Sequence, residues 1–532
     1  MGKLVPNAFN LFVVVFVALG SAACTYGTSV IGTTIGQPSF FKTLNLAEQG
    51  TPGYSRTSQY IGAFNGLNSA GSAIGAVICS YAADKWSRKH AIQGAAVILI
   101  IGAALCAGSV NVAMFLVARF INGLGIGALV TAIPMYQAEV STPEGRGFMV
   151  SMHGVMSAVG YGLQAWVGFG VYWITAGGST SSFPWRFPIA FQIAPALGLL
   201  IGSPFLPYSP RWLMMKDRND EAHEVLKRLH RTKADPHDTL ARKEFYQMRK
   251  QVELDRQLNP NNSKFEIFRT PANRKRAMVG FFLLFNNMFS GALVIANYGI
   301  ILYTSLGMTG FMPLLLTTLM VSSTLPGNIL CAFIVDRFGR RKFMLIGLIG
   351  ILIDLIMETA LEASFLGTKN KIGQDFAVLF IFLFLTPFWS TFVDAPQFLY
   401  TSEIMPTHVR SQGIAVAVTG FYFAQIILLI AGPIALNNIG WKFFFVLIIP
   451  TFFNILFVFF MCPETKGRSL EDINALFGEA VAVHYYNANE EEQRELEKAV
   501  EIDEADDTGK RASIDEEKGA TNAHQEVGST QV

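Results

Sequence analysis

The stretch Asp84-Lys85-Trp86-Ser87-Arg88-Lys89 decides the fold of this chain, because its pattern returns as Asp336-Arg337-Phe338-Gly339-Arg340-Arg341. Each copy follows a long apolar run and precedes another, so each is expected to be a tight charged turn between two apolar helices. A second pair repeats in the same order, since the stretches Glu139–Arg146 and Glu403–Arg410 each run from an acid to an arginine over the same spacing. The sequence therefore predicts two halves that carry matching charged elements.

The apolar residues are gathered into runs that are long enough to cross a lipid bilayer. The 532 residues are 51% hydrophobic, include 44 Phe and are only 15% charged, whereas soluble domains are about a quarter charged. Runs of about 20 apolar residues are typical of membrane helices. We expect an all-α membrane protein with twelve transmembrane helices in two six-helix halves and a cytosolic helical linker. The expected spans lie near 9–31, 59–82, 91–110, 112–138, 148–175, 187–206, 277–303, 311–335, 343–365, 375–402, 409–431 and 441–461.

The chain divides into four regions by composition. We expect an N-terminal half over 1–206, a linker over 207–276, a C-terminal half over 277–479 and a disordered acidic tail over 480–532. Lys and Arg gather in the connections on one side of the predicted membrane, and this bias places that side in the cytosol. Both termini are then cytosolic, and the plasma membrane is the expected location, with the vacuolar membrane as the alternative.

Several classes of function are disfavoured by the residues. No nucleic-acid module is evident, no grouping has metal-ligand spacing, and no catalytic motif is present, so we expect neither an enzyme nor a bound cofactor. The glycine-rich stretch Gly123–Gly127 lies inside an apolar run and lacks a following Lys-Ser/Thr, which argues against nucleotide binding. The expected partners are the lipid bilayer and a small solute, with the chain as a monomer. Basic residues before Ser513 offer a hypothesis of phosphorylation and contact with the endocytic machinery.

A series of linked motifs resembles the sugar porters of the major facilitator superfamily, in their fungal style, over about residues 10–475. The motifs are the doubled charged turn, Arg119–Gly127, Pro134–Glu139 with Arg146-Gly147, Trp185–Pro188, Ser209–Leu213, Ser402-Glu403 with Arg410, and Pro463–Leu470. The resemblance implies the major facilitator fold and alternating-access transport of a sugar or polyol-like solute. Duplicated halves of this kind are typical of secondary transporters.

The repeated acids and bases are interpreted as a charge network that gates one end of the bundle. Carboxylates beside guanidinium groups at helix ends form charge-assisted, often bidentate hydrogen bonds, and these must break when the halves separate. The alternative is that the bases only set membrane topology, although fixed acidic partners at repeated spacing argue against it. The network residues are Asp84, Arg88, Arg119, Glu139, Arg146, Asp336, Arg340, Glu403, Arg410 and Glu464.

Arg119 begins a glycine-rich apolar helix, where a charge needs an interior partner. In proton-coupled relatives that partner is an acid on the first helix, but the matching position here is Gly27. The resemblance therefore favours a facilitator over a proton symporter. Asp394, beside Pro396, is the candidate for proton coupling in the rival symporter, and a transporter-like nutrient sensor is a further alternative. Asp354, Glu358 and Glu362 share one helix face, but that helix packs outside the cavity in the resembling fold.

A solute-binding site is carried over from the resemblance with several changes. The amides that would hold a hexose are partly absent, because Gly154, Met288 and Leu293 occupy matching positions. His153 is a candidate replacement donor. A polyol needs hydrogen-bonding side chains and an aromatic face. The candidate solute-binding residues are His153, Tyr161, Asn287, Asn297, Tyr298, Thr324, Phe398, Tyr422 and Gln425.

Overall fold

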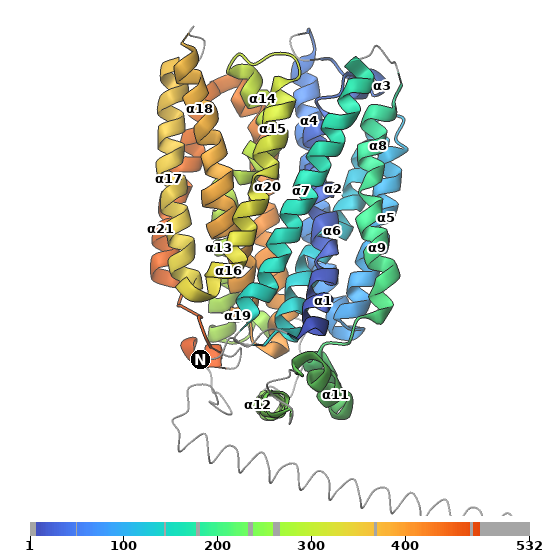
Figure 1. Cartoon of the computed structure of the whole chain (residues 1–532), viewed down its shortest axis with the longest axis vertical. Helices are drawn as coiled ribbons and strands as arrows, with labels where there is room; N and C mark the ends of the chain where they lie inside the picture. The colour runs from blue at the N-terminus through green and yellow to red at the C-terminus, as the bar shows by residue number, and fades with distance from the viewer. Residues whose placement is uncertain are drawn as a thin grey trace, which may run out of the picture.

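The computed structural model describes residues 7–48, 51–142, 145–176, 181–231, 238–258, 266–365, 370–468 and 472–478. Within these residues every regular element is a helix. Most helices stand side by side along one axis, and the helices α11 (Asn219–His230) and α12 (Thr239–Leu258) lie beyond one end of the bundle (Figure 1). The predicted tail and its Ser513 lie outside the described residues.

Many membrane-crossing segments are built from consecutive helices that meet at a kink. The first half contains α1 (Ala8–Val17), α2 (Leu19–Thr34), α3 (Pro38–Thr43), α4 (Tyr54–Lys85), α5 (Arg88–Ala107), α6 (Val112–Val140), α7 (Arg146–Ala176), α8 (Phe183–Phe191), α9 (Ile193–Gly202) and η1 (Ser203–Phe205). The connection adds α10 (Pro210–Met215) and η2 (Glu266–Phe268) to α11 and α12. The second half contains α13 (Pro271–Phe289), α14 (Ala292–Ser305), α15 (Met312–Ser322), α16 (Thr324–Phe338), α17 (Arg340–Phe365), α18 (Lys371–Leu383), the π-helix η3 (Phe384–Asp394), α19 (Ala395–Ile404), η4 (Thr407–Val409), α20 (Arg410–Ile439), η5 (Gly440–Phe444), α21 (Phe445–Met461) and α22 (Asp472–Leu476).

Judged by length and composition alone, ten helical segments of the described chain are long and apolar enough to cross a membrane. Two more, α4 and α7, have 32 and 31 residues and run through the same bundle (Figure 1). They are less apolar because they carry polar side chains that are buried inside the protein, such as Asn65 and Asn68 on α4 and Gln164 on α7. The predicted twelve-helix membrane fold is thereby confirmed.

The outer surface of the bundle is apolar. Ile74, Val77 and Ile78 of α4 are about half exposed, and Phe453 and Phe460 of α21 are more than half exposed. Exposed apolar surface on this scale marks contact with a membrane or a partner, and its position along helices of spanning length fits lipid.

The duplicated charged stretch forms the same turn twice. Ser87 has φ 116° and ψ 159°, and the matching Gly339 has φ 92° and ψ 156°. This left-handed backbone suits glycine, and it explains why one copy carries Gly339. Ser87 tolerates the same position while its hydroxyl accepts a hydrogen bond from the backbone N–H of His90 at 3.3 Å. The end of the bundle that holds both turns is called the charged end below, and the end that holds α3 the opposite end.

The glycine-rich stretch of α6 is a helix-packing surface. A Cβ at Gly123 would lie 2.1 Å from the Asn68 carbonyl oxygen, and one at Gly127 would lie 1.8 Å from that of Ser72. Gly71 on α4 faces α6 in the same way. Small residues four apart allow helix backbones to approach closely where lipid gives no hydrophobic drive. The role of Gly123–Gly127 is thus close contact between α4 and α6.

Candidate functional site

A buried ion-pair network holds together the charged end of the first half. The Arg88 guanidinium donates two hydrogen bonds to the Glu139 carboxylate, at 3.0 and 3.1 Å, and a third to Asp84 at 3.2 Å. The Arg88 and Glu139 side chains are fully buried. Bidentate pairing of this kind fixes geometry as well as charge. The turn at 84–89 is therefore locked to the end of α6.

The second half repeats this network. Arg340 donates to both oxygens of Glu403, at 3.2 and 2.9 Å, and lies 2.9 Å from Asp336. Glu464, placed after the last crossing helix, accepts from the backbone N–H groups of Arg340 and Arg341 at 2.7 and 3.1 Å. It therefore satisfies two open donors at the N-terminus of α17.

A hydroxyl completes each copy of the network. Ser209 donates to Glu139 at 2.5 Å, and Thr465 donates to Glu403 at 2.6 Å. Both hydroxyls come from the chain that leaves the sixth crossing of their half. The motifs around Ser209 and Thr465 thus have matching positions in the two halves.

The two halves also contact one another at the charged end. Arg410 of α20 donates to Glu139 of α6 at 3.4 Å, and Ser411 donates to Asp84. In the other direction, the Phe148 backbone N–H of α7 donates to Asp336 at 2.9 Å. A carboxylate partner of Arg410 thus belongs to the opposite half. These bonds close the charged end between the halves.

The connecting segment reinforces this closure. Arg211 of α10 donates to Thr407 of the second half at 3.2 Å, and Asp255 of α12 pairs with His408 at 3.2 Å. Arg146, the remaining predicted network residue at this end, is buried at the start of α7.

Arg119 lies in the interior with neutral partners. Its guanidinium donates to the Gly27 carbonyl at 2.9 Å, to the Phe64 carbonyl at 3.4 Å and to the Asn65 side chain at 3.4 Å. The Asn65 amide donates in turn to the Tyr298 hydroxyl at 3.0 Å. Among the described residues, no acid pairs with Arg119. Gly27, which stands where proton-coupled relatives have an acid, therefore contacts Arg119 through its backbone carbonyl.

A small central cavity lies between the halves, away from both rims. Its volume is 40 Å³, which holds no more than a few waters. Three predicted site residues line it: Tyr161, Thr324 and Asp394. The rest of the lining is apolar or aromatic. It comprises Met288, Ala292, Leu293, Ala296, Val321, Leu385, Trp389 and Phe421. Met288 and Leu293 are placed at the site by the resemblance, and the others were missed from the sequence.

The π-helix explains why Trp389 was missed. An α-helix places side chains on one face every three or four residues, whereas η3 is wound more widely from Phe384 to Asp394. The side chains of Trp389 and Asp394 consequently reach the same cavity. Pro387 within this element and Pro396 just after it are sequence signals for the irregularity.

Asn287, an expected solute donor, is committed to other amides. It donates to Gln397 at 3.2 Å and accepts from Asn454 at 2.8 Å, and all three side chains are fully buried. This amide chain ties α13, α19 and α21 together within the second half. It lies outside the set of described residues that line the cavity.

The other expected solute residues are buried in contacts between helices. His153 shares a 2.7 Å hydrogen bond with Ser21, and its ring meets that of Phe398 edge-on at 5.0 Å. Tyr298 donates to the Leu429 carbonyl at 2.8 Å. Asn297 donates to the Leu293 carbonyl, Gln425 accepts from Ser69, and Tyr422 is buried on α20.

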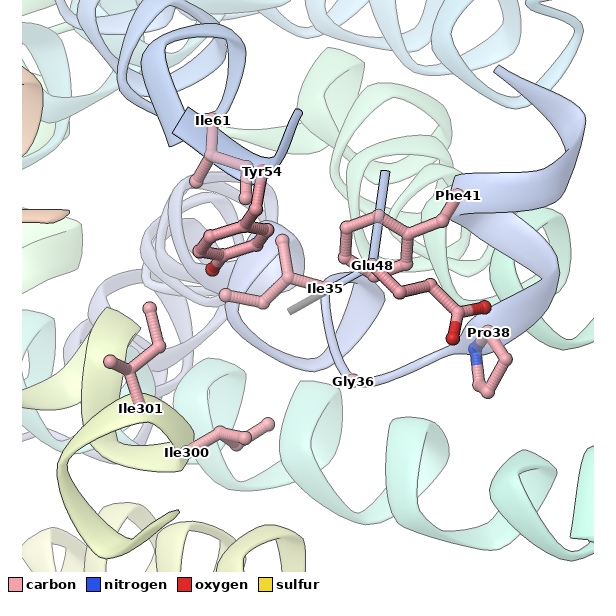
Figure 2. A pocket seen from close by; sticks show the side chains of 9 residues that line it. All are labelled: Ile35, Gly36, Pro38, Phe41, Glu48, Tyr54, Ile61, Ile300 and Ile301. Atoms are coloured by element: carbon pink, nitrogen blue, oxygen red, sulfur yellow. The ribbon is translucent and has the colours of Figure 1, made fainter. Parts of the chain in front are cut away.

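A second cavity of 210 Å³ lies at the opposite end, between the halves. Figure 2 shows the rings of Phe41 and Tyr54 and the side chain of Glu48 on the first-half side, with Ile300 and Ile301 of α14 on the other. The lining is completed by Ile35, Gly36, Pro38 and Ile61.

The acids on α17 are buried away from both cavities. Asp354, Glu358 and Glu362 are each 3% exposed or less and follow one face of the helix. None of them is among the described residues that line the cavities.

Two duplicated halves, mirrored charge networks and cavities on the seam between the halves define a membrane transporter. Residues 13–477 match the family model described as "Sugar (and other) transporter". The chain belongs to this family.

Named relatives and solved structures agree with this assignment. MFS-type transporter criB of Aspergillus cristatus is 32% identical over 475 residues, covering 89% of this chain and 95% of that protein. Sugar transporter STL1 of Saccharomyces cerevisiae is 28% identical, covering 79% of this chain and 72% of that protein. The proton:xylose symporter XylE bound to 6-bromo-6-deoxy-D-glucose superposes with a TM-score of 0.75 at 23% identity, over 88% of this chain and 100% of that one. The relatives are transporters, as predicted, and not enzymes.

Proposed function

We propose that this chain is a secondary carrier that moves a sugar or related polyhydroxy solute across a membrane by alternating access. The observation that carries the proposal is the reciprocal bonding at the charged end, where each half supplies a carboxylate to the other. Such contacts close one side of a central cavity and can be exchanged for an open arrangement as the halves rock. The relatives include proteins named as glucose transporters.

The carrier is proposed to be a facilitator. Arg119 is held by carbonyl oxygens and an amide, and these groups do not titrate. Protonation therefore has no acid on α2 through which to switch the Arg119 contacts. The rival is a proton symporter in which Asp394 of the central cavity is the proton carrier.

The proposed setting is the plasma membrane, with the charged end and both termini in the cytosol and the chain as a monomer. The bases of the charged end support this orientation. The tail is proposed to engage the endocytic machinery. Deleting residues 480–532 should then change the surface level of the protein or its response to nutrient.

The test is uptake of labelled sugars and polyols by a yeast strain that lacks its own sugar carriers. A facilitator brings the solute to equilibrium, does so in the presence of a protonophore, and leaves the external pH unchanged. Alkalinisation of the medium on adding solute, abolished by Asp394→Asn, would instead establish the symporter. Absence of uptake across the panel would reject transport of this solute class.

A further inference from the structure

We infer that the central cavity, once it widens from its closed volume of 40 Å³ as the halves separate, selects a protonated amine carried on a compact, sparsely hydroxylated ring. The inference rests on the proposed carrier function, and it specifies a solute that carries an amine and fewer hydroxyls than a sugar. It starts from Asp394, which lines a cavity whose other described residues include no Lys, Arg or His. Within the described chain, Asp394 makes no ion pair, and its one hydrogen bond is accepted from Asn328 at 3.3 Å.

A carboxylate in such a place requires compensation. Removing a charge from water is costly unless a partner of opposite charge or several hydrogen bonds replace the water. The Asn328 amide provides one long hydrogen bond to Asp394, and its nitrogen also donates to the Thr324 carbonyl at 3.3 Å. The carboxylate can accept further hydrogen bonds on the side of the cavity, where a cationic group of the solute would supply them and balance its charge.

Aromatic rings supply the second part of a cation site. Tyr161, Trp389 and Phe421 line the cavity together with Asp394. The faces of aromatic rings attract ammonium groups, Trp most strongly, and cages of such rings recognise organic cations. Three rings and one carboxylate therefore match the charge and the apolar body of an amine.

The scarcity of other polar groups limits the hydroxyls that the solute carries. Of the described lining, Thr324 and Tyr161 provide the hydroxyls, and no amide side chain is present. The amides of Asn287, Gln397 and Asn454 bond to one another elsewhere. If the solute carried a hydroxyl on every carbon, most of those hydroxyls would find no hydrogen-bond partner in the cavity, and affinity would be lost.

The cavity at the opposite end has a similar composition. Glu48 lies with Phe41 and Tyr54 among isoleucines, and the described lining again contains no base (Figure 2). A cation with an apolar body would thus meet one carboxylate and aromatic rings at both positions along the seam between the halves.

The test is binding to the full-length protein in nanodiscs, at neutral pH, by isothermal titration calorimetry. The probes form two matched pairs, cyclohexylamine with cyclohexanol and glucosamine with glucose. Each amine should bind at least about tenfold more tightly than its neutral partner, as expected for a hydrogen-bonded charge pair. The preference should fall below about twofold in Asp394→Asn and persist in Asp375→Asn, which changes an exposed acid on α18. Equal or weaker binding of the amines to the unmodified protein, or a preference retained in Asp394→Asn, would overturn the inference.

Two additions keep the result decisive. If Asp394→Asn is not monodisperse on size exclusion, Trp389→Leu replaces it and should weaken amine binding more than alcohol binding; an equal effect on both would overturn the inference. Entry of labelled glucosamine and glucose into proteoliposomes separates the two claims. Entry without preference for the amine contradicts this inference alone, whereas an amine preference in binding with no entry of either probe contradicts the proposed carrier function alone.

Discussion

Replacing Arg410 with Ala should raise the population that is open at the charged end. Arg410 reaches across the halves to Glu139 at 3.4 Å, and both side chains are fully buried. A hydrogen bond to a charged group contributes about 1.5–3 kcal/mol, and this one is longer than the usual range. We therefore take the lower value, about 1.5 kcal/mol, which corresponds to roughly a tenfold shift in the equilibrium. Glu139 keeps Arg88 and Ser209 as partners, so the fold should persist.

Cys331 is a native reporter of this opening. It is buried in a cluster that joins Ala138 and Val150 of the first half to Val335 and Leu399 of the second. Separation of the halves at the charged end exposes the cluster. When opening and closing are fast relative to labelling, the maleimide labelling rate follows the open population. The rate at Cys331 should rise about tenfold in Arg410→Ala, with Cys331→Ser identifying the signal.

Arg341→Ala is the matched control. Arg341 lies at the same end, but its described contacts, with Phe459 and Glu464, stay within the second half. Its loss should leave Cys331 labelling within about twofold of the unmodified protein. Unchanged labelling in Arg410→Ala, or equal acceleration in both variants, would refute the assignment of the Arg410–Glu139 pair to the gate.

Three further outcomes follow from the described contacts. Arg119→Ala should abolish uptake, because the three interior hydrogen bonds of Arg119 are lost. The variant should still be recovered from the membrane as monodisperse protein, and normal uptake would contradict the prediction. Asn287→Ala should lower thermal stability, since it leaves the Gln397 and Asn454 amides without a shared partner at a cost of about 1–3 kcal/mol. Solute affinity should stay unchanged. Lost affinity with normal stability would instead place Asn287 in the solute site. Gly127→Ala should prevent recovery of folded protein by fluorescence-detected size exclusion, because its Cβ would lie 1.8 Å from the Ser72 carbonyl oxygen, whereas Gly170→Ala, with no atom within 4 Å of its Cβ, should behave normally.

The fold and the gate were largely predictable because their signals are local and repeated. Length and apolarity locate most of the crossings, and the doubled turn places Arg88 and Arg340 at helix ends. The partner of Arg410 was not predictable in this way. The spacing from Glu403 to Arg410 suggested a partner for Arg410 within the second half, whereas the described bond runs to Glu139 of the first half. Pairing between the halves depends on how they pack, which sequence spacing does not show.

The central cavity was less predictable for two physical reasons. The π-helix shifts side chains relative to a regular helix, so Trp389 arrives at the lining without a periodic signal. Residues such as Asn287 are also able to bond either a solute or a neighbouring amide, and sequence position alone does not decide between them. Asn65, which links Arg119 to Tyr298, lies in an α4 stretch with many polar residues and no distinguishing motif.

The central claim, alternating access by a facilitator, is tested most directly by counterflow in proteoliposomes. Vesicles containing the full-length protein are loaded with the unlabelled form of a solute that enters carrier-deficient yeast, and the same solute, labelled, is added outside without an ion gradient. A carrier that exposes its cavity to one side at a time should take up label transiently above its equilibrium level, with or without a protonophore. Label that rises monotonically to equilibrium, or an overshoot that a protonophore removes, would contradict the account.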